Sequence, residues 1–334
     1  MPHSNSSSAS WRIAIVRALP GLGDMLCLVP TLRALRAAFP MAEITLIGLP
    51  GIKTLMQRFR PYIDGWLEFP GYPGIPEVPL LPSRTMEFLA QVQQTPFDLA
   101  LQLHGSGSYI NSFTLLLGAK QTAGFFPVGQ ACPAELFLPY PDQTSEIWRN
   151  LRLIEWLGIP LQGDALEFPV YESDRQEACA LIQRYGLQPD RYLCLHPGAS
   201  ISSRRWDAQH FARVGKALAT QGWQIVLTGS QSERKLTEAV AQRMTTPSIN
   251  LAGQTSLGGM AALLSQARLL IANDTGVSHL AAALAVNSVV IFSDSDPQRW
   301  GPLDRQRHAV LVRPAPDAVL AAAHQRLQGV AYAR

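Results

Sequence analysis

The hydrophobic positions of this chain fall into two kinds of run that alternate with each other. Short and nearly continuous apolar runs, such as residues 97–105 (FDLALQLHG), are typical of buried strands. Longer runs in which apolar residues recur every three or four positions, such as residues 145–157, are typical of amphipathic helices. Because the two patterns alternate along the whole chain, we expect parallel sheets in which right-handed crossovers bring the turns after the strands to one edge.

The alternation is more regular in the second half of the chain than in the first. Two proline-containing segments, residues 70–82 and 125–143, are predicted to be irregular, and residues 159–170 are the best candidate for a linker. The expected strands are residues 11–17, 42–50, 97–105, 191–199, 222–230, 268–276 and 287–293. The expected helices are residues 25–39, 51–66 (ending in a loop), 108–120, 145–157, 207–221, 232–244, 257–267 and 277–285.

The length of the chain favours two domains, since 334 residues exceed what one compact core usually holds. Hydrophobic residues make up 47% and charged residues 16%, which is typical of a well-buried globular protein. We expect a disordered tail at residues 1–10, an N-terminal domain at residues 11–165 and a C-terminal domain at residues 166–334. The predicted fold class is α/β, with two Rossmann-like doubly wound domains that face each other across a cleft.

Charge and cysteine content narrow the possible partners and the compartment. The net charge of +3 suits a phosphorylated acceptor or a membrane surface, but it is too small to indicate nucleic acid binding. The four cysteines, Cys27, Cys132, Cys179 and Cys194, are far apart and form no C-x-x-C pair, which favours the reducing cytoplasm. No run approaches the ~20 apolar residues of a spanning helix, so any membrane contact is expected to be peripheral.

A glycine-rich turn follows the first expected strand, in the stretch RALPGLGDMLCLVP at residues 17–30. It resembles a dinucleotide-binding loop, but Leu26 stands where the third glycine of G-x-G-x-x-G belongs, and Asp24 would repel a pyrophosphate. A dinucleotide site is therefore not expected in this half. Asp24 either caps the following helix or acts as a general base at the mouth of the cleft, and the residues alone leave both interpretations open.

A second polar turn, NDTGVSHL at residues 273–280, joins a buried strand to an alanine-rich helix. Gly276 allows a ligand close to the backbone, and the first-turn amides together with the helix dipole favour a diphosphate. Thr275 can add a hydroxyl donor, and His279 lies one turn further along the helix. The alternative is a well-capped buried helix, with Asp274 or Thr275 as the cap and His279 as a core histidine.

Two other strand ends carry polar side chains. The stretch HPGASISSRRW at residues 196–206 contains Arg204 and Arg205, which suit an anion or form a solvated basic loop. The stretch LTGSQSERK at residues 227–235 places Glu233 near a helix start, where it can bind ribose hydroxyls or favour the helix dipole. Both stretches therefore fit a nucleotide site and an ordinary surface loop.

Asp294 and Asp296 form a D-x-D pair after the last expected strand. Two acids at this spacing can hold Mg²⁺ or Mn²⁺, but Pro297 makes a turn an equally good interpretation. No cluster of histidines and cysteines indicates zinc. We therefore expect no metal site.

Taken together, these stretches resemble glycosyltransferase family 9, the lipopolysaccharide heptosyltransferase family. The resemblance implies a GT-B fold whose C-terminal half binds a nucleotide-sugar, and an inverting transfer that needs no metal or cofactor. It rests mainly on GLGDMLCLVPTLRALRAAFP, FDLALQLHG, LHPGASISSRRW, LLIANDTGVSHLAAAL and DPQRWGP, which follow one another between residue 12 and about residue 303.

The resemblance also implies roles for individual residues. Asp24 falls on the carboxylate that activates the acceptor hydroxyl. Arg204, where many members have Lys, falls on a contact to the donor diphosphate. The other implied contacts are Thr275, Gly276 and His279 for the diphosphate and sugar, Glu233 for the ribose, and Asp274 near the transferred sugar.

The implied reaction moves heptose from ADP-heptose to a bacterial cell-envelope glycolipid or lipopolysaccharide core oligosaccharide, with peripheral contact to the inner membrane surface. A GDP- or UDP-sugar donor and a non-catalytic sugar-nucleotide-binding protein are the alternatives. An NAD-dependent oxidoreductase is the alternative at the level of the fold, and the missing third glycine disfavours it. The candidate acceptor contacts are the loops at residues 53–60 and 105–109.

Overall fold

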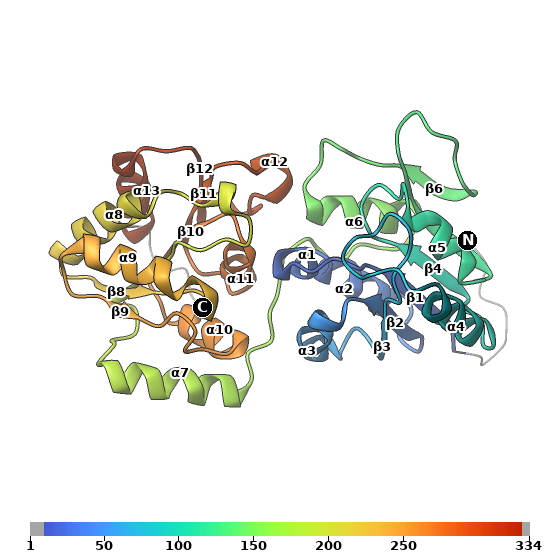
Figure 1. Ribbon diagram of the computed structural model, residues 1–334, viewed down its shortest axis with the longest axis horizontal. Coiled ribbons are helices and arrows are strands. Elements are labelled where there is room, and N and C mark those ends of the chain that lie inside the picture. The colour runs from blue at the N-terminus through green and yellow to red at the C-terminus, as the bar shows by residue number, and fades with distance from the viewer. Residues whose placement is uncertain (1–9, 329–334) are drawn as a thin grey trace. The chain divides into compact units, whose positions relative to one another are not determined.

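The structure, a computed structural model, describes residues 10–328 of the chain. These residues form two compact units that divide between Ala165 and Leu166, called unit 1 and unit 2 below. Each unit contains a six-stranded sheet in which every strand pair is parallel (Figure 1). The prediction of two doubly wound, Rossmann-like sheets is confirmed. The tail predicted at residues 1–10 lies, apart from Ser10, outside the described residues.

The sheet of unit 1 has the strand order β3-β2-β1-β4-β5-β6. The chain order reverses between the neighbours β1 and β4, so the connections after these two strands leave toward opposite faces. Such a switch point is where open α/β sheets bind their ligands. The strands are β1 (Arg12–Val16), β2 (Glu43–Gly48), β3 (Gly65–Glu68), β4 (Leu99–Gln102), β5 (Gln121–Phe126) and β6 (Leu136–Pro139).

Helices cover the sheet of unit 1 on both faces. On one face, α4 and α5 pack through Val92 and Phe113 against a core that includes Val16 of β1. Since strand side chains alternate between faces, Ile13 and Ile15, which are fully buried, point to the other face, on the side of α2 and α6. The helices are α1 (Leu22–Leu26), α2 (Val29–Ala38), α3 (Lys53–Met56), α4 (Pro82–Gln93), α5 (Ile110–Leu116) and α6 (Glu146–Trp156).

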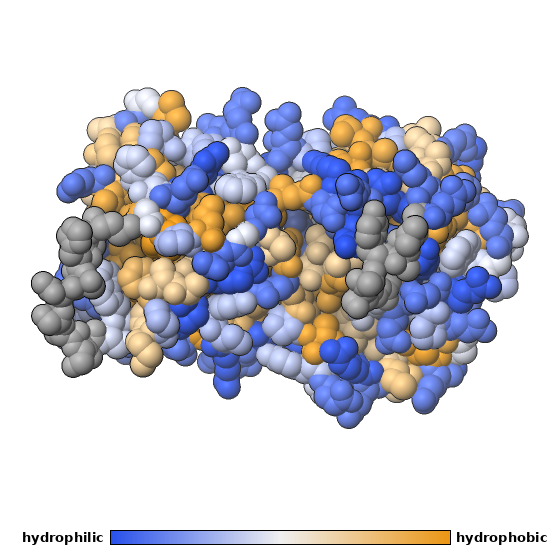
Figure 2. Space-filling model, turned by 180° about the vertical axis from the view of Figure 1, so that it is seen from behind, coloured by the Kyte–Doolittle hydropathy of each residue, from blue (hydrophilic) through white to orange (hydrophobic). Residues whose placement is uncertain are grey.

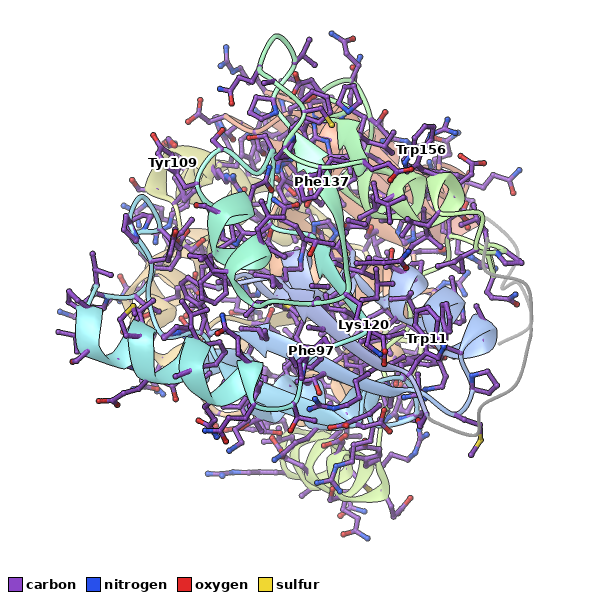
Figure 3. The ribbon with its side chains drawn as sticks, turned by 90° about the vertical axis from the view of Figure 1, so that its right-hand side faces the viewer. Trp11, Phe97, Tyr109, Lys120, Phe137 and Trp156 are labelled. Carbon is purple, nitrogen blue, oxygen red and sulfur yellow. The ribbon has the colours of Figure 1, made fainter. Side chains whose placement is uncertain are left out.

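The amino-terminal edge of this sheet holds contacts that tie its strands together. Figure 3 labels Phe97 and Lys120 at this edge, where the Lys120 amide donates a hydrogen bond to the Phe97 carbonyl (3.0 Å). The ammonium group of Lys120 lies 2.7 Å from Oδ1 of Asp98, and the backbone amide of Arg12 donates to Oδ2 of the same carboxylate (2.8 Å). The polar groups at this edge are thus used to join β1, β4 and β5.

The sheet of unit 2 repeats this plan with the strand order β12-β11-β10-β7-β8-β9, and its switch point lies between β7 and β10. The core on one face joins Leu193 and Leu195 of β7 to Phe211 of α8, and α9 and α13 also contribute to it. On the other face, the hydroxyl of Tyr192 donates to the carbonyl of Leu263 in α10. The strands are β7 (Tyr192–His196), β8 (Gln224–Leu227), β9 (Ile249–Asn250), β10 (Leu269–Asn273), β11 (Ser288–Phe292) and β12 (His308–Val312). The helices are α7 (Glu172–Tyr185), α8 (Ala208–Thr220), α9 (Arg234–Met244), α10 (Leu257–Ser265), α11 (Gly276–Ala283), α12 (Pro297–Trp300) and α13 (Pro316–Gln328), with 3₁₀ turns η3 (Ser202–Arg204) and η4 (Gln231–Glu233).

The structure contains elements that the sequence pattern did not predict, namely the strands β3, β5, β6, β9 and β12 and the helices α4, α7, α12 and α13. The single helix predicted at residues 25–39 is wrong, because α1 ends at Leu26 and a second helix, α2, begins at Val29 with Pro30 in its first turn, where proline is favourable. The segment predicted to be irregular at residues 125–143 contains β6, and the loop predicted at the end of residues 51–66 contains the start of β3. β3 and β6 are short and lie at the two edges of the sheet of unit 1, where their pairing partners, and not their own sequence pattern, define them.

Apolar side chains also reach the surface. Figure 2 shows them interspersed with polar residues on the visible face. Well-exposed examples are Met41, Met86 and Val128. Among residues 10–328, no helix has both the length and the apolar character required to span a bilayer.

Candidate active site

The predicted site residues lie after the carboxyl ends of strands in both sheets. In unit 1, Asp24 lies in α1, directly after the loop that follows β1. In unit 2, Arg204 follows β7, Glu233 follows β8 and Asp274 follows β10. This is the edge at which doubly wound sheets bind ligands, so the placement agrees with a binding role in each unit.

Asp24 lies inside the first turn of α1, because the N-cap residue of that helix is Gly21. The interpretation of Asp24 as the N-cap residue is therefore wrong. Its carboxylate folds back over the loop, and a Cβ atom built on Gly21 would lie only 2.1 Å from Oδ2 of Asp24. A side chain at residue 21 would therefore displace the Asp24 carboxylate from this position. The Asp24 side chain is 21% exposed, so a reactant can reach it.

Arg17, the residue after β1, holds the backbone of Asp24 through two hydrogen bonds. Its Nε and Nη2 atoms donate to the Asp24 carbonyl oxygen at 3.1 and 2.9 Å, and Nη2 lies 3.0 Å from Oε1 of Glu146 in α6. Nη1 donates to the carbonyl of Leu103 (2.5 Å), and both charged side chains are buried. The sequence analysis placed Arg17 at the end of an expected strand and gave it no role.

His104 ties the loop after β4 to the loop after β1. Its Nδ1 atom accepts a hydrogen bond from the Ala18 amide (3.2 Å). Burial and the positive charge of Arg17 lower the pKa of His104 to about 4, although the carboxylate of Glu146 acts in the opposite direction. The imidazole is therefore neutral at physiological pH, as an acceptor for this amide must be.

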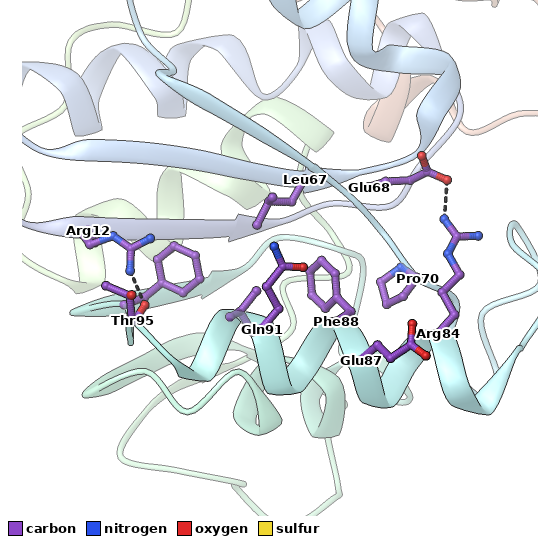
Figure 4. A pocket seen from close by; sticks show the side chains of 11 residues that line it. Arg12, Leu67, Glu68, Pro70, Arg84, Glu87, Phe88, Gln91 and Thr95 are labelled. Carbon is purple, nitrogen blue, oxygen red and sulfur yellow. Dashed lines mark hydrogen bonds and ion pairs between the residues drawn. The ribbon is translucent and has the colours of Figure 1, made fainter.

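Unit 1 contains two cavities of ≈ 440 Å³ each, and both are lined in part by the Glu68–Arg84 ion pair. The first lies at the carboxyl edge of the sheet, beside Pro20 and the loop that leads to Asp24. The second runs along α4 toward Arg12 (Figure 4). Apolar walls dominate the first cavity, where Leu49, Pro50, Ile52, Val78 and Pro79 lie near the acids Glu68 and Glu77.

In unit 2, Arg204 lies close to the start of α11. Its Nη1 atom is 3.9 Å from Oδ2 of the buried residue Asp274, and its side chain is 28% exposed. Thr275 is the N-cap residue of α11, but its side chain makes no hydrogen bond to the helix. Thr275 therefore occupies the N-cap position that the alternative gave it, although its hydroxyl does not bond to the helix. Thr275 and Gly276 are partly exposed, so the first turn of α11 is open to an anion.

His279 lies one turn into α11 and is buried. Its ring lies 6.0 Å from the ring of Trp300, at an interplanar angle of 78°. This edge-to-face contact joins α11 to α12 and gives His279 an aromatic neighbour that the sequence did not indicate.

Glu233 makes local contacts and also touches the loop after β7. Its Oε2 atom accepts from the Ser230 amide (2.7 Å) and hydroxyl (2.8 Å), which completes a capping box at η4. A Cβ atom on Gly198 would lie 2.1 Å from its Oε1 atom. Burial lowers the pKa of the adjacent His196, while the Glu233 carboxylate opposes that shift. The ribose contact of Glu233 stays a prediction.

Asn273, the last residue of β10, was given no role in the sequence and is fully buried. Its amide nitrogen donates to the carbonyls of Pro197 (2.8 Å) and Gly198 (3.3 Å), and its Oδ1 atom accepts from the Trp206 amide (2.9 Å). This side chain thus lies at the centre of the loops that carry the predicted donor contacts.

The D-x-D pair is part of a turn. Oδ1 of Asp296 accepts a hydrogen bond from the Gln298 amide (2.8 Å) and caps α12, while Asp294 is exposed. Across residues 10–328, no three or more His, Cys, Asp or Glu side chains are grouped so that they could hold a metal ion.

Comparison with known sequences shows which protein family this chain resembles. The sequence model of glycosyltransferase family 9 (heptosyltransferase) matches residues 87–326. Lipopolysaccharide heptosyltransferase 2 of Escherichia coli is 28% identical over 165 residues, which cover 48% of this chain and 46% of that protein. Lipooligosaccharide heptosyltransferase 2 of Haemophilus ducreyi is 33% identical over 35% of each chain. The chain therefore matches less than half the length of these curated relatives.

Solved structures extend the likeness in fold to nearly the whole chain. A family 9 glycosyltransferase from Veillonella parvula covers 97% of this chain and 99% of its own, with a TM-score of 0.80 and 22% identity. The ADP-heptose lipopolysaccharide heptosyltransferase II of E. coli covers 95% and 98%, with a TM-score of 0.70 and 21% identity. An E. coli heptosyltransferase solved with ADP covers 94% and 99%, with a TM-score of 0.68 and 18% identity.

Two Rossmann-like sheets, together with these structural neighbours, define the GT-B fold. Since the family model matches well over half of the chain, the protein belongs to glycosyltransferase family 9, the heptosyltransferase family.

Proposed function

We propose that this protein is an inverting, metal-independent glycosyltransferase that moves heptose from ADP-heptose to a lipopolysaccharide core acceptor. The observation that carries the proposal is the open first turn of α11 beside Arg204, at the switch point of a sheet in a family 9 chain. The choice of heptose and of lipopolysaccharide is supported by the names of the relatives. The choice of ADP is supported by the E. coli heptosyltransferase that was solved with it.

Unit 2 is proposed to bind the donor. Arg204 offers a forked donor to the diphosphate, and the amides and dipole at Thr275 and Gly276 add positive potential. Glu233 accepts hydrogen bonds from the ribose hydroxyls. Asp274 contacts the transferred sugar, and His279 contacts the diphosphate and sugar. All of these groups bind the intact donor. The interactions of the cationic groups with the diphosphate become stronger as it leaves, because its negative charge grows.

The proposed reaction is a single displacement. The acceptor hydroxyl oxygen forms a bond to the anomeric carbon while the bond between that carbon and the diphosphate oxygen breaks. Asp24 takes the hydroxyl proton, and the electron pair of the broken bond stays on the departing nucleoside diphosphate. Arg204 and the first turn of α11 stabilise this growing charge, so no metal is needed for it.

Unit 1 is proposed to bind the acceptor. The cavity beside Pro20 lies on the same sheet edge as Asp24 and offers apolar walls with carboxylates that can accept hydrogen bonds from sugar hydroxyls. The loops at residues 53–60 and 105–109 are proposed to add contacts. A glycolipid acceptor also implies peripheral contact with the inner membrane surface, for which exposed Leu81 and Met86 at the start of α4 are candidates.

The test combines purified protein, ADP-heptose and lipopolysaccharide from a strain that cannot add heptose. We expect release of ADP and a heavier lipopolysaccharide product. The Asp24→Asn variant should lose about 10²–10⁴-fold in turnover yet bind ADP like the wild type. The matched control, Asp142→Asn, changes an exposed aspartate of unit 1 and should keep full turnover.

Two outcomes would contradict the proposal. Wild-type-like turnover of Asp24→Asn would remove the base from the mechanism. Stronger thermal stabilisation by GDP or UDP than by ADP would replace the proposed donor, because the ligand that binds most tightly raises Tm most.

A further inference from the structure

One buried side chain holds both ends of the loop that carries Arg204. This loop, residues 197–206, leaves β7 and returns to the sheet at Trp206. The Asn273 amide nitrogen donates to the carbonyls of Pro197 and Gly198 at its first end (2.8 and 3.3 Å). The Asn273 Oδ1 atom accepts from the Trp206 amide at its second end (2.9 Å).

The middle of the loop has few other anchors. The Nε atom of Arg205 donates to the Ala199 carbonyl (2.9 Å), which is a contact within the loop itself. Outside the loop, Nη1 of Arg204 lies 3.9 Å from Oδ2 of Asp274, and Trp206 is anchored because its indole donates to the Pro314 carbonyl (3.0 Å) and its ring belongs to the core of unit 2. The first end therefore depends on Asn273 to hold its carbonyls toward β10.

The same side chain connects the three groups of predicted donor contacts. Asn273 directly precedes Asp274 in the chain and holds Gly198, whose Cα lies against the Glu233 carboxylate. It also fixes Trp206, two residues beyond Arg204. Only a group that donates and accepts at once can make these bonds, and a planar amide does so.

We propose that Asn273 is the positioning residue of the donor site, which sets the place of Arg204 relative to the first turn of α11. This inference rests on the proposed function, because it gives Arg204 the diphosphate as its ligand. Asn273 itself touches no substrate. Its loss weakens diphosphate binding because the loop that carries Arg204 no longer occupies one position.

Two substitutions separate the two ends of the loop. Asn273→Asp keeps the shape and the acceptor for the Trp206 amide but replaces the donor to Pro197 and Gly198. Asn273→Ala removes both. The matched control is Asn287→Asp, since the Asn287 amide also donates to a backbone carbonyl, that of Arg326 (3.2 Å), away from the loop.

Hydrogen exchange tests, without any ligand, whether Asn273 holds the loop at residues 197–206 in place. We expect faster exchange of the amides at residues 199–205 in both Asn273 variants and unchanged exchange in Asn287→Asp. The Trp206 amide should stay protected in Asn273→Asp and lose protection in Asn273→Ala. Exchange like that of the wild type over residues 199–205 in both variants would overturn the inference, whatever the nucleotide measurements give.

Calorimetry with ADP, AMP and adenosine then tests the effect on the site. We expect Asn273→Asp and Asn273→Ala to weaken ADP binding by about tenfold or more, to affect AMP less and to leave adenosine within about twofold. Equal losses for all three ligands would show a general disturbance of unit 2 and would also overturn the inference. Failure of the wild type to bind ADP would contradict the proposed donor instead, and the exchange measurement would still decide the role of Asn273.

Discussion

Arg17 and Glu146 form a buried ion pair in unit 1, with Nη2 of Arg17 3.0 Å from Oε1 of Glu146, although 129 residues separate them in the chain. The other carboxylate oxygen of Glu146 lies 3.3 Å from Nη1 of Arg149. Asp24 adds a second negative charge, with Oδ1 3.9 Å from Nη2 of Arg17. Two guanidinium groups and two carboxylates thus balance one another at the switch point of this sheet.

Removal of Glu146 should therefore destabilise unit 1. Glu146→Gln removes the carboxylate that lies beside both buried guanidinium groups, those of Arg17 and Arg149, and we expect a loss of about 3–5 kcal/mol in the free energy of unfolding. The control is Glu155→Gln on the same helix, where an exposed pair with Arg152 contributes no more than about 0.5 kcal/mol. Urea unfolding measures both variants, and equal losses would contradict a special role for the buried pair.

Arg204 offers a test of the diphosphate contact. Arg204→Ala should weaken ADP binding by about tenfold to a hundredfold, because it removes a charged donor from the phosphate site. Arg204→Lys keeps the charge and should restore most of that affinity, and adenosine binding should be unchanged in both variants. Titration calorimetry gives all of these values. Full ADP affinity in Arg204→Ala would place the diphosphate elsewhere.

His104 and His308 should make the protein sensitive to acid. Burial lowers the pKa of each to about 4 from the ordinary value of 6.5, so between these values the unfolded chain binds more protons than the folded one. Their stabilising contribution is complete above pH 6.5 and is lost as the pH falls toward 4.

Substitution at His308 tests this dependence. His308→Asn can still bond the Ser288 hydroxyl, which lies 2.8 Å from Nδ1 of the histidine, but it cannot titrate. Urea unfolding across this pH range should show a weaker dependence of stability on pH than in the wild type. His324→Asn, a change at a partly exposed position of α13, should keep the wild-type dependence. If the stability of His308→Asn depends on pH as steeply as that of the wild type, His308 does not cause this part of the acid sensitivity.

Transfer should not depend on a divalent metal if, as proposed, Arg204 and the first turn of α11 supply the positive potential at the leaving group. After dialysis against EDTA, turnover should stay within about twofold of the untreated protein, and added Mg²⁺ or Mn²⁺ should change it no further. Lost activity that Mn²⁺ restores would overturn the metal-independent mechanism.

Much of the fold was predictable because its signals are local. Asp207 and Ser145, the first residues of two expected helices, cap α8 and α6: the Asp207 carboxylate accepts from the Gln209 amide (2.7 Å), and the Ser145 hydroxyl accepts from the Trp148 amide (3.2 Å). By contrast, β3 and β6 were missed. An edge strand is recognised by the neighbour with which it pairs, and four residues of either strand carry too little pattern of their own.

The features of the candidate site likewise divide into those that the sequence predicted and those that only the tertiary structure revealed. The sequence by itself determined the alternation of strands and helices, the glycine-rich turn before Asp24 and the polar turn at Thr275, because each is written in adjacent residues. Only the tertiary structure revealed that Arg17 binds Glu146 and that Asn273 binds Pro197, 76 residues away. Such contacts depend on which strands become neighbours in the sheet, and that order results from the packing of the whole unit.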